Sequence, residues 1–275
     1  MADWLRTYLR TYLGAYLVLC RMWTKAAWQY PASLILLSLG HVVVTGLEFA
    51  AVLVVFAHTT ELAGFSLPEM AFLYGTTGVS FAVVEAAIGV VDHLGQRIRT
   101  GTFDVMLIRP VPALVQLAAE GFTPRRLAAV LQAAAVLGYG LATVDTQWTA
   151  GRVAMVPVML LAGMGIFAAV FVLGAAFQFL ANDAVELQSA FTHGGRFLTQ
   201  YPISLYGREA ARALTFVLPV AFINWQPALY VLDRTDPTGL PPFLRFCSPL
   251  VAAALLGVAG LAWRAGLRGY RSTGS

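Results

Sequence analysis

The sequence predicts an all-α integral membrane protein. Of its 275 residues, 59% are hydrophobic and only 12% are charged, and the mean hydropathy is +0.72. A soluble domain is about half apolar and about a quarter charged, so this chain has more apolar surface than a soluble fold can bury. Backbone inside a bilayer must form helices or a closed barrel. The long unbroken apolar runs favour helices over the short alternating segments of a barrel.

The first segment, 2–29, predicts an amphipathic helix that lies at the membrane interface. Aromatic residues recur every four positions and basic residues share another face: Trp4, Tyr8, Tyr12 and Tyr16 with Arg6 and Arg10. This combination is typical of the headgroup region of a bilayer. The alternative is an N-terminal extension of the first span, but Pro31 interrupts the run.

We expect six transmembrane helices in a single transmembrane domain that covers 1–275. About 20 apolar residues cross a hydrocarbon core about 30 Å thick. The expected spans are 32–57, 69–91, 127–144, 153–177, 183–201 and 249–267. Most basic residues fall in the N-terminal helix, in the loop 92–126 and at the C-terminal end. The positive-inside rule therefore predicts a multi-pass protein of the cytoplasmic membrane with both termini and this loop in the cytoplasm.

The region 178–248 allows two topologies. Hydropathy alone selects 214–232 as the fifth span and leaves 181–212 in the cytoplasm. A helical wheel instead shows that 183–201 is amphipathic, with one polar face formed by Glu186, Ser189, His193, Arg196 and Gln200. Such a helix could cross the membrane inside a bundle or lie on the cytoplasmic surface. If it crosses, 202–232 becomes an external, partly re-entrant segment broken by prolines.

The motifs of several catalytic classes are absent from the sequence. There is no GxxxxGK[ST] loop, and the single lysine, Lys25, lies in RMWTK. Neither HExxH nor GxSxG occurs. The two cysteines, Cys20 and Cys247, form neither a disulfide framework nor a metal cluster. We therefore expect a non-catalytic subunit without a metal or cofactor of its own, and the net charge of +4 is too small to indicate a nucleic-acid partner.

Charged residues inside the expected spans are candidates for a translocation path or a subunit interface. A charge at the bilayer centre costs about 2.5–3.5 kcal/mol. Glu48 lies near the middle of the first span, His41 shares its helical face, and Glu85 lies near the inner end of the second span. The polar face of 183–201 adds Glu186, His193 and Arg196 to this set. The alternative is that these groups only form hydrogen bonds that hold the helices together.

The cytoplasmic loop 92–126 carries the most ordered pattern in the chain. Its candidate contact residues are Gln96, Arg97, Arg99, Gly101, Asp104, Arg109 and Pro110. The pattern predicts a helix, a break at Gly101, and a second amphipathic helix at the inner membrane surface. Asp104 could cap this second helix or pair with Arg97 or Arg99. A cytoplasmic loop that is only positively charged would explain the arginines. It would not explain the ordered placement of glycine and proline.

Three segments resemble one family of membrane proteins. IRTGTFDVMLIRPV, residues 98–111, resembles the segment after the second span of type-2 ABC exporter permeases, which carry Gly-Thr-hydrophobic-Asp followed by Leu and Arg-Pro. Residues 201–232 resemble that family's external region between spans five and six, with Gly207 where proline is expected. The ending WRAGLRGYRSTGS, 263–275, resembles the tail of a subfamily in which two related permeases serve one ATPase.

The resemblance implies a six-span half-transporter with a coupling helix in 92–117 that docks on a separate ABC ATPase subunit. ATP and Mg would bind that partner, and a second permease, identical or related, would complete the pore among membrane lipids. The resemblance also favours the interpretation in which 183–201 crosses the membrane. The expected function is ATP-driven export of an amphipathic or lipid-like substrate. The alternative is a secondary transporter or channel with ion sites at Glu48, Glu85 and His193, although no inverted repeat supports it.

Overall fold

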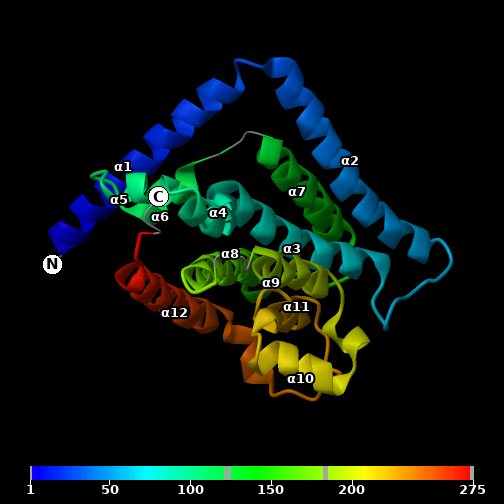
Figure 1. The fold of residues 1–275 in the computed structure, drawn as a ribbon. Helices are drawn as coiled ribbons and strands as arrows, with labels where there is room; N and C mark the ends of the chain where they lie inside the picture. Colours follow the sequence, from blue (N-terminus) through cyan, green and yellow to red (C-terminus); the bar gives the residue numbers. More distant parts are fainter. Residues whose placement is uncertain (1, 121, 123–124, 182–184, 273–275) are drawn as a thin grey trace.

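The computed structural model describes residues 2–120, 122, 125–181 and 185–272, and its side chains from 12 onward except 125, 185 and 187. The regular structure of these residues is helical. Figure 1 shows α1 and α2 as two arms of a V beside a bundle of longer helices, with α4, α5 and α6 near the C-terminus at one end. The expected interfacial aromatics Trp4 and Tyr8, with Arg6 and Arg10, lie outside the described side chains.

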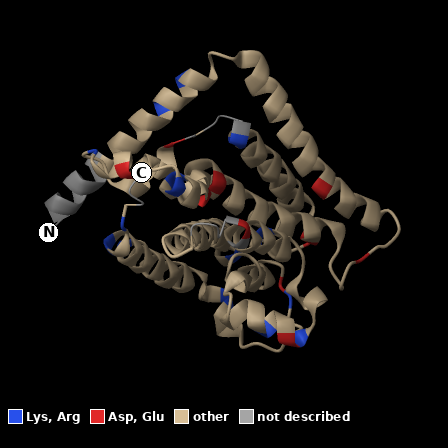
Figure 2. Ribbon diagram, in the orientation of Figure 1, with Lys and Arg blue, Asp and Glu red and all other residues tan. Residues whose placement is uncertain are grey.

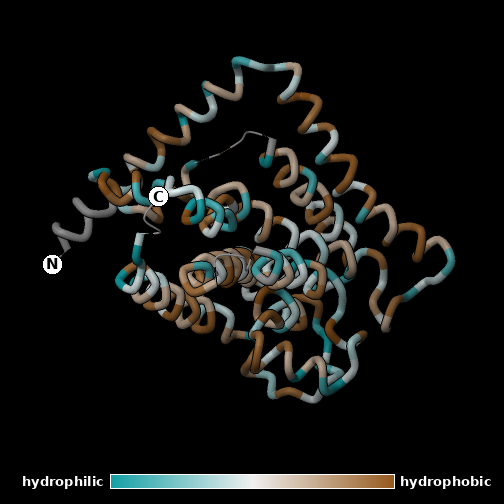
Figure 3. Tube along the Cα trace, viewed as in Figure 1, coloured by the Kyte–Doolittle hydropathy of each residue, from teal (hydrophilic) through white to brown (hydrophobic). Residues whose placement is uncertain are grey.

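Helix α1 (Ala2–Ala27) and helix α2 (Pro31–Phe56) are separate because Pro31 begins the second one. Proline suits the first turn of a helix, where its missing N–H needs no partner. Within α2 only Val52 is buried, and the helix is among the most apolar parts of the chain in Figure 3. Most of α2 therefore faces lipid or another subunit.

Helix α3 (Leu67–Ile88) forms the centre of the bundle. It starts at a capping box in which Ser66 and Glu69 satisfy each other's backbone N–H groups. It continues through the short η1 helix (Gly89–His93) into α4 (Leu94–Arg99). The combined stretch Leu67–Arg99 is apolar and long enough to cross a membrane, and most of it is buried.

Glycines bring α3 and α7 (Arg125–Thr143) into close backbone contact. A Cβ atom on Gly75 would lie 2.5 Å from the Cα atom of Leu137. A Cβ atom on Gly140 would lie 2.6 Å from the backbone nitrogen of Phe72. Small residues permit such approach between membrane helices, where dispersion contacts replace hydrophobic driving force. The contact needs no GxxxG motif because the glycines come from different helices.

Five helical segments pass the length and composition test for a membrane span among the described residues. They are α2, Leu67–Arg99, Arg126–Thr143 within α7, α8 (Ala150–Gln178) and α12 (Ser248–Gly269). Helix α9 (Val185–Gln200) is not among them, since its described part has 16 polar-rich residues. The start of the expected span 183–201 lies outside the described residues, and its crossing stays a prediction.

The segment after α9 is folded back on itself. Helix α10 (Arg208–Phe216) and the stretch Val220–Val231, which ends in α11 (Trp225–Val231), meet at 81°. Pro219 lies at the break. The straight span over 214–232 that hydropathy alone selects is therefore wrong as a single helix. A bent pair of this kind is either a broken span or a re-entrant loop.

Ion pairs fasten this bent segment to the end of the bundle that lies away from α4 and the C-terminus (Figure 1). Arg234 donates two hydrogen bonds of 2.7 Å to the carboxylate of Glu69 at the start of α3. Arg152, at the start of α8, pairs with Asp233 at 2.8 Å. Figure 2 shows that charged residues gather near the helix ends. Two polar ends separated by apolar helices suit a membrane-spanning body.

Candidate functional site

Gly101 forms a sharp turn between α4 and α5 (Thr102–Leu107). Its φ of 69° places it in the left-handed region, where a residue with a Cβ atom loses about 1–2 kcal/mol. The expected break at Gly101 between two helical stretches is therefore present. The second amphipathic element is divided further, because Pro110 and Pro112 separate α5 from α6 (Ala113–Ala119).

Buried apolar side chains fix this segment to the bundle. Leu94, Ile98, Phe103 and Met106 are each at most 5% exposed. The Phe103 ring packs against the ring of Phe179 at the end of α8, with centroids 5.6 Å apart. This contact joins α5 directly to the end of α8.

Asp104 is bound by the C-terminal tail. Its carboxylate accepts hydrogen bonds from the Tyr270 hydroxyl at 2.8 Å and the Ser272 hydroxyl at 2.7 Å. It makes no capping bond for α5, and Arg97 pairs with Glu120 at 3.1 Å instead. The cap of α5 and the pair with Arg97 that were expected for Asp104 are not formed, because the tail reaches the carboxylate. Pairing with Arg99, the other expected partner, stays a prediction. Burial, together with the bond to Asp104, raises the pKa of Tyr270 to about 12.

The opposite face of the α4–α5 segment is open. Val105 is 49% exposed, Leu107 is 41% exposed and Ile108 is 84% exposed. The predicted contact residues Gln96, Arg99, Arg109 and Pro110 are exposed on the same segment. Apolar side chains beside arginines on an exposed surface are typical of a protein contact.

Helix α6 packs against the α4–α5 segment on the side that faces α1. The Gln116 amide donates to the carbonyl oxygens of Met106 at 2.9 Å and Val111 at 2.6 Å. A cavity of about 300 Å³ lies between α1 on one side and α5 and α6 on the other. Its lining residues are Leu19, Met22, Trp23, Ala26, Met106, Arg109, Gln116 and Glu120. Helix α1 thus rests on the same short helices that carry the predicted contact residues.

A buried glutamine network links α4 to α9, and the sequence analysis did not find it. Gln178 of α8 accepts a hydrogen bond from the backbone N–H of Gly95 and donates to the carbonyl oxygen of Asp92 at 2.8 Å. It also donates to Gln188 of α9, which in turn donates to the Asp92 carboxylate. The signal in the sequence was polar Gln178 at the end of a long apolar run, because a buried amide must find partners.

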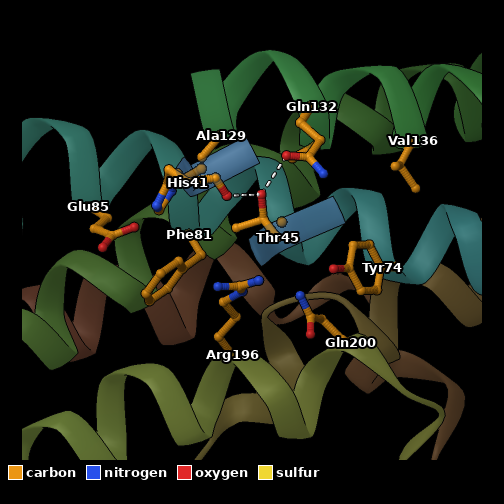
Figure 4. Close-up of a pocket in the computed structure, with 13 residues that line it drawn as sticks. His41, Thr45, Tyr74, Phe81, Glu85, Ala129, Gln132, Val136, Arg196 and Gln200 are labelled. Carbon is orange, nitrogen blue, oxygen red and sulfur yellow. Dashed lines mark hydrogen bonds between the residues drawn. The ribbon is translucent and has the colours of Figure 1, made fainter. Parts of the chain in front are cut away.

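A polar cleft lies between α2, α3, α7 and α9 (Figure 4). It encloses about 30 Å³, and its polar lining residues are His41, Thr45, Tyr74, Glu85, Gln132, Arg196 and Gln200. Arg196 pairs there with Glu48, across 148 positions of sequence. The Tyr74 hydroxyl lies 3.5 Å from the same Glu48 oxygen. The cleft therefore brings together charges from three helices.

Four of the six predicted path residues gather at this cleft: His41, Glu48, Glu85 and Arg196. His193 packs by its ring edge against Phe81, with centroids 5.2 Å apart. Glu186 is exposed. The buried polar residues of α9 are Gln188, Thr192, Thr199 and Gln200, of which Gln200 belongs to the expected face. Shelter of Glu186 at a subunit interface stays a prediction.

Other polar contacts in the cleft connect helices directly. The Thr45 hydroxyl lies 2.5 Å from the amide oxygen of Gln132, which joins α2 to α7. Arg126 donates to the backbone carbonyl of Glu85 at 2.7 Å. Among the described residues, no three His, Cys, Asp or Glu side chains are placed to hold a metal ion.

The apolar helices, the polar cleft and the anchored short helices at one end define a multi-pass membrane protein of the transport type. A model of the ABC-2 family of transporter proteins matches residues 42–274. The chain therefore belongs to the ABC-2 transporter family and is a permease component of an ABC transporter, a family that works with an ABC ATPase subunit. Neither a curated protein nor a solved structure matches the chain.

Proposed function

We propose that this chain is the membrane-spanning subunit of an ATP-driven exporter that moves an amphipathic or lipid-like substrate outward. The sequence has no phosphate-binding loop, so ATP and Mg would bind and react on a separate nucleotide-binding subunit. A second permease, identical or related, would complete the translocation path. The basic N-terminal, loop and C-terminal segments support a cytoplasmic position of both ends.

One observation carries this proposal: the α4–Gly101–α5 segment is anchored on one face and open on the other. Phe103 and Met106 are buried, while Val105 and Ile108 of the same segment are 49% and 84% exposed. A contact that transmits force must be rigid on the side of the bundle and free on the side of the partner. This segment meets both conditions.

The buried glutamines supply a route from that contact to the polar cleft. Gln178 binds the backbone of α4 at Gly95 and the side chain of Gln188 on α9. Helix α9 carries Arg196, whose ion pair with Glu48 reaches α2. A movement of α4 driven by the ATPase would therefore shift α9 against α2, and this shift would open or close the cleft.

The test is retention of the ATPase by the purified permease. Ile108→Asp places a charge in the exposed apolar face without touching the buried anchors, so we expect the partner ATPase to dissociate while the permease stays folded. Phe243→Asp is the matched control, because Phe243 is 63% exposed and lies on η4 (Pro242–Phe246), next to the start of α12. Equal ATPase retention and substrate-stimulated hydrolysis in both variants would place the coupling contact elsewhere.

A further inference from the structure

Hydrogen-bond donors converge at one end of the polar cleft. Figure 4 shows Arg196 and Gln200 extending from α9 toward the side on which Tyr74 and Thr45 lie. Gln200 is 1% exposed, and its amide nitrogen has no hydrogen-bond partner in the described structure. A buried donor without an acceptor is rare in folded proteins. This end of the cleft therefore holds one donor that its present acceptors do not satisfy.

The carboxylate of Glu48 now lies against two of these donors, Arg196 and Tyr74. The guanidinium of Arg196 is paired with its carboxylate, and the Tyr74 hydroxyl lies 3.5 Å from the same oxygen. The cleft holds only about 30 Å³ of free space. A second acidic group cannot enter beside Glu48, and it must take the place of that carboxylate.

The surrounding structure holds Arg196 more firmly than it holds its ion-pair partner Glu48. Arg196 lies on a packed helix, with its side chain 14% exposed and its guanidinium 5.4 Å from the ring centroids of Phe81 and Phe197. Glu48 lies on α2, in which only Val52 is buried. A separation of α2 from α9 would carry Glu48 away with α2 and leave Arg196 on its packed helix. A buried cation without a partner is strongly unfavourable.

We propose that Arg196, Tyr74 and Gln200 form the headgroup site for an acidic amphiphile, and that Glu48 is the internal carboxylate which the substrate displaces. This inference rests on the proposed function and names its substrate class: one carboxylate or phosphate on an apolar tail. The incoming anion neutralises Arg196 and satisfies the Gln200 amide as α2 moves away. The apolar wall of Phe81, Ala129, Ala133 and Val136 accommodates the start of the tail.

The experiment measures binding of a fluorescent fatty acid to the full chain in phosphatidylcholine nanodiscs, with the methyl ester of the same probe as the neutral reference. The wild-type chain should prefer the acid. Arg196→Gln should weaken binding of the acid by about tenfold or more, as loss of a buried charge partner does. Glu48→Gln should tighten it by about tenfold, because the competitor is gone. Competition by dodecanoate and by dodecyl phosphate distinguishes the two headgroups.

A double variant, Glu48→Gln with Arg196→Gln, separates binding from folding. It removes both charges of the Glu48–Arg196 pair together, so the chain should stay folded and lose its preference for the acid. Glu61→Gln in the exposed loop after α2 is the control. Equal binding of acid and ester by the wild-type chain, or no tightening in Glu48→Gln, would overturn the inference. Because binding is measured without the ATPase, retention of the ATPase by these variants tests the proposed function separately.

Discussion

The hydroxyl of Tyr270 donates a 2.8 Å hydrogen bond to Asp104, across 166 positions of sequence. The ring of Tyr270 also stands edge-on against Phe103, with centroids 5.2 Å apart. The end of the last long helix therefore holds the segment that we propose as the ATPase contact. Any force applied to α5 acts on α12 as well as on α8.

Tyr270→Phe should loosen this contact while it keeps the aromatic packing. The hydrogen bond is partly exposed, so its loss should cost at most about 1 kcal/mol. We expect correct insertion, a slightly lower Tm, and ATP hydrolysis that is less well coupled to transport. Tyr139→Phe is the control, because Tyr139 is an exposed tyrosine of α7. Unchanged coupling in Tyr270→Phe would show that the tail bond does not position α5.

The same hydrogen bond should depend on pH in the alkaline range only. Tyrosine in an unfolded chain titrates near about 10, and the folded pKa of Tyr270 is about 12. The folded state thus favours the neutral phenol, so the stabilisation is complete below about pH 10 and is lost as the pH rises through about 12. Thermal unfolding of wild type and Tyr270→Phe across this range should show a difference that shrinks above pH 10. A difference that disappears near neutral pH would contradict this assignment.

Gly101→Ala should strain the turn between α4 and α5. Its φ of 69° is unfavourable for alanine by about 1–2 kcal/mol. Gly257→Ala in α12 is the matched control, since a Cβ atom there meets nothing within 4 Å and alanine is the better helix former. We expect reduced ATPase retention for Gly101→Ala alone, measured by co-purification. Equal retention in both variants would mean that the turn tolerates a side chain or does not contribute to docking.

Gly140→Val should separate α3 from α7. The added side chain meets the backbone of Phe72, with the Cβ atom only 2.6 Å from its nitrogen. Overpacking of this kind costs about 1–3 kcal/mol or more. Gly138 lies on the same helix, and a Cβ atom added there would meet nothing within 4 Å. The Gly138→Val variant should therefore behave like wild type. The measurement is thermal stability in detergent, and equal Tm values for the two variants would argue against the close contact.

Single cysteines at positions 60, 99, 208 and 271, introduced into a cysteine-free background, test the topology. In Figure 1 the loop after α2, which carries position 60, and helix α10, which begins at Arg208, lie toward the end of the bundle with the bent segment. Helix α4, which ends at Arg99, and the C-terminus lie toward the other end. An impermeant thiol reagent added to intact cells should label positions 60 and 208 only. Labelling at 60 without labelling at 208 would leave 208 on the cytoplasmic side and exclude α9 as the fifth span.

The class of fold and the position of most helices follow from the amino-acid sequence alone. An apolar run of about 20 residues has few alternatives to a helix in a bilayer. Pro31 begins a helix and Gly101 separates two helices for local steric reasons. The same local logic singled out the segment around Gly101 as the most ordered of the connections between the expected spans. It also singled out Glu48 and Arg196, because charges in apolar runs are costly wherever they lie.

Which of these groups meet depends on how the helices pack against one another. The partner of Asp104 is Tyr270 rather than a neighbouring arginine, and Glu48 meets Arg196 across 148 positions. Periodicity fixes the face of a helix only relative to its own axis, so a small rotation of α9 exposes Glu186 and buries Gln188. Contacts of α9 with other helices, such as the hydrogen bond between Gln178 of α8 and Gln188, set that rotation. No local pattern encodes it, because it depends on shape matching between helices far apart in the chain.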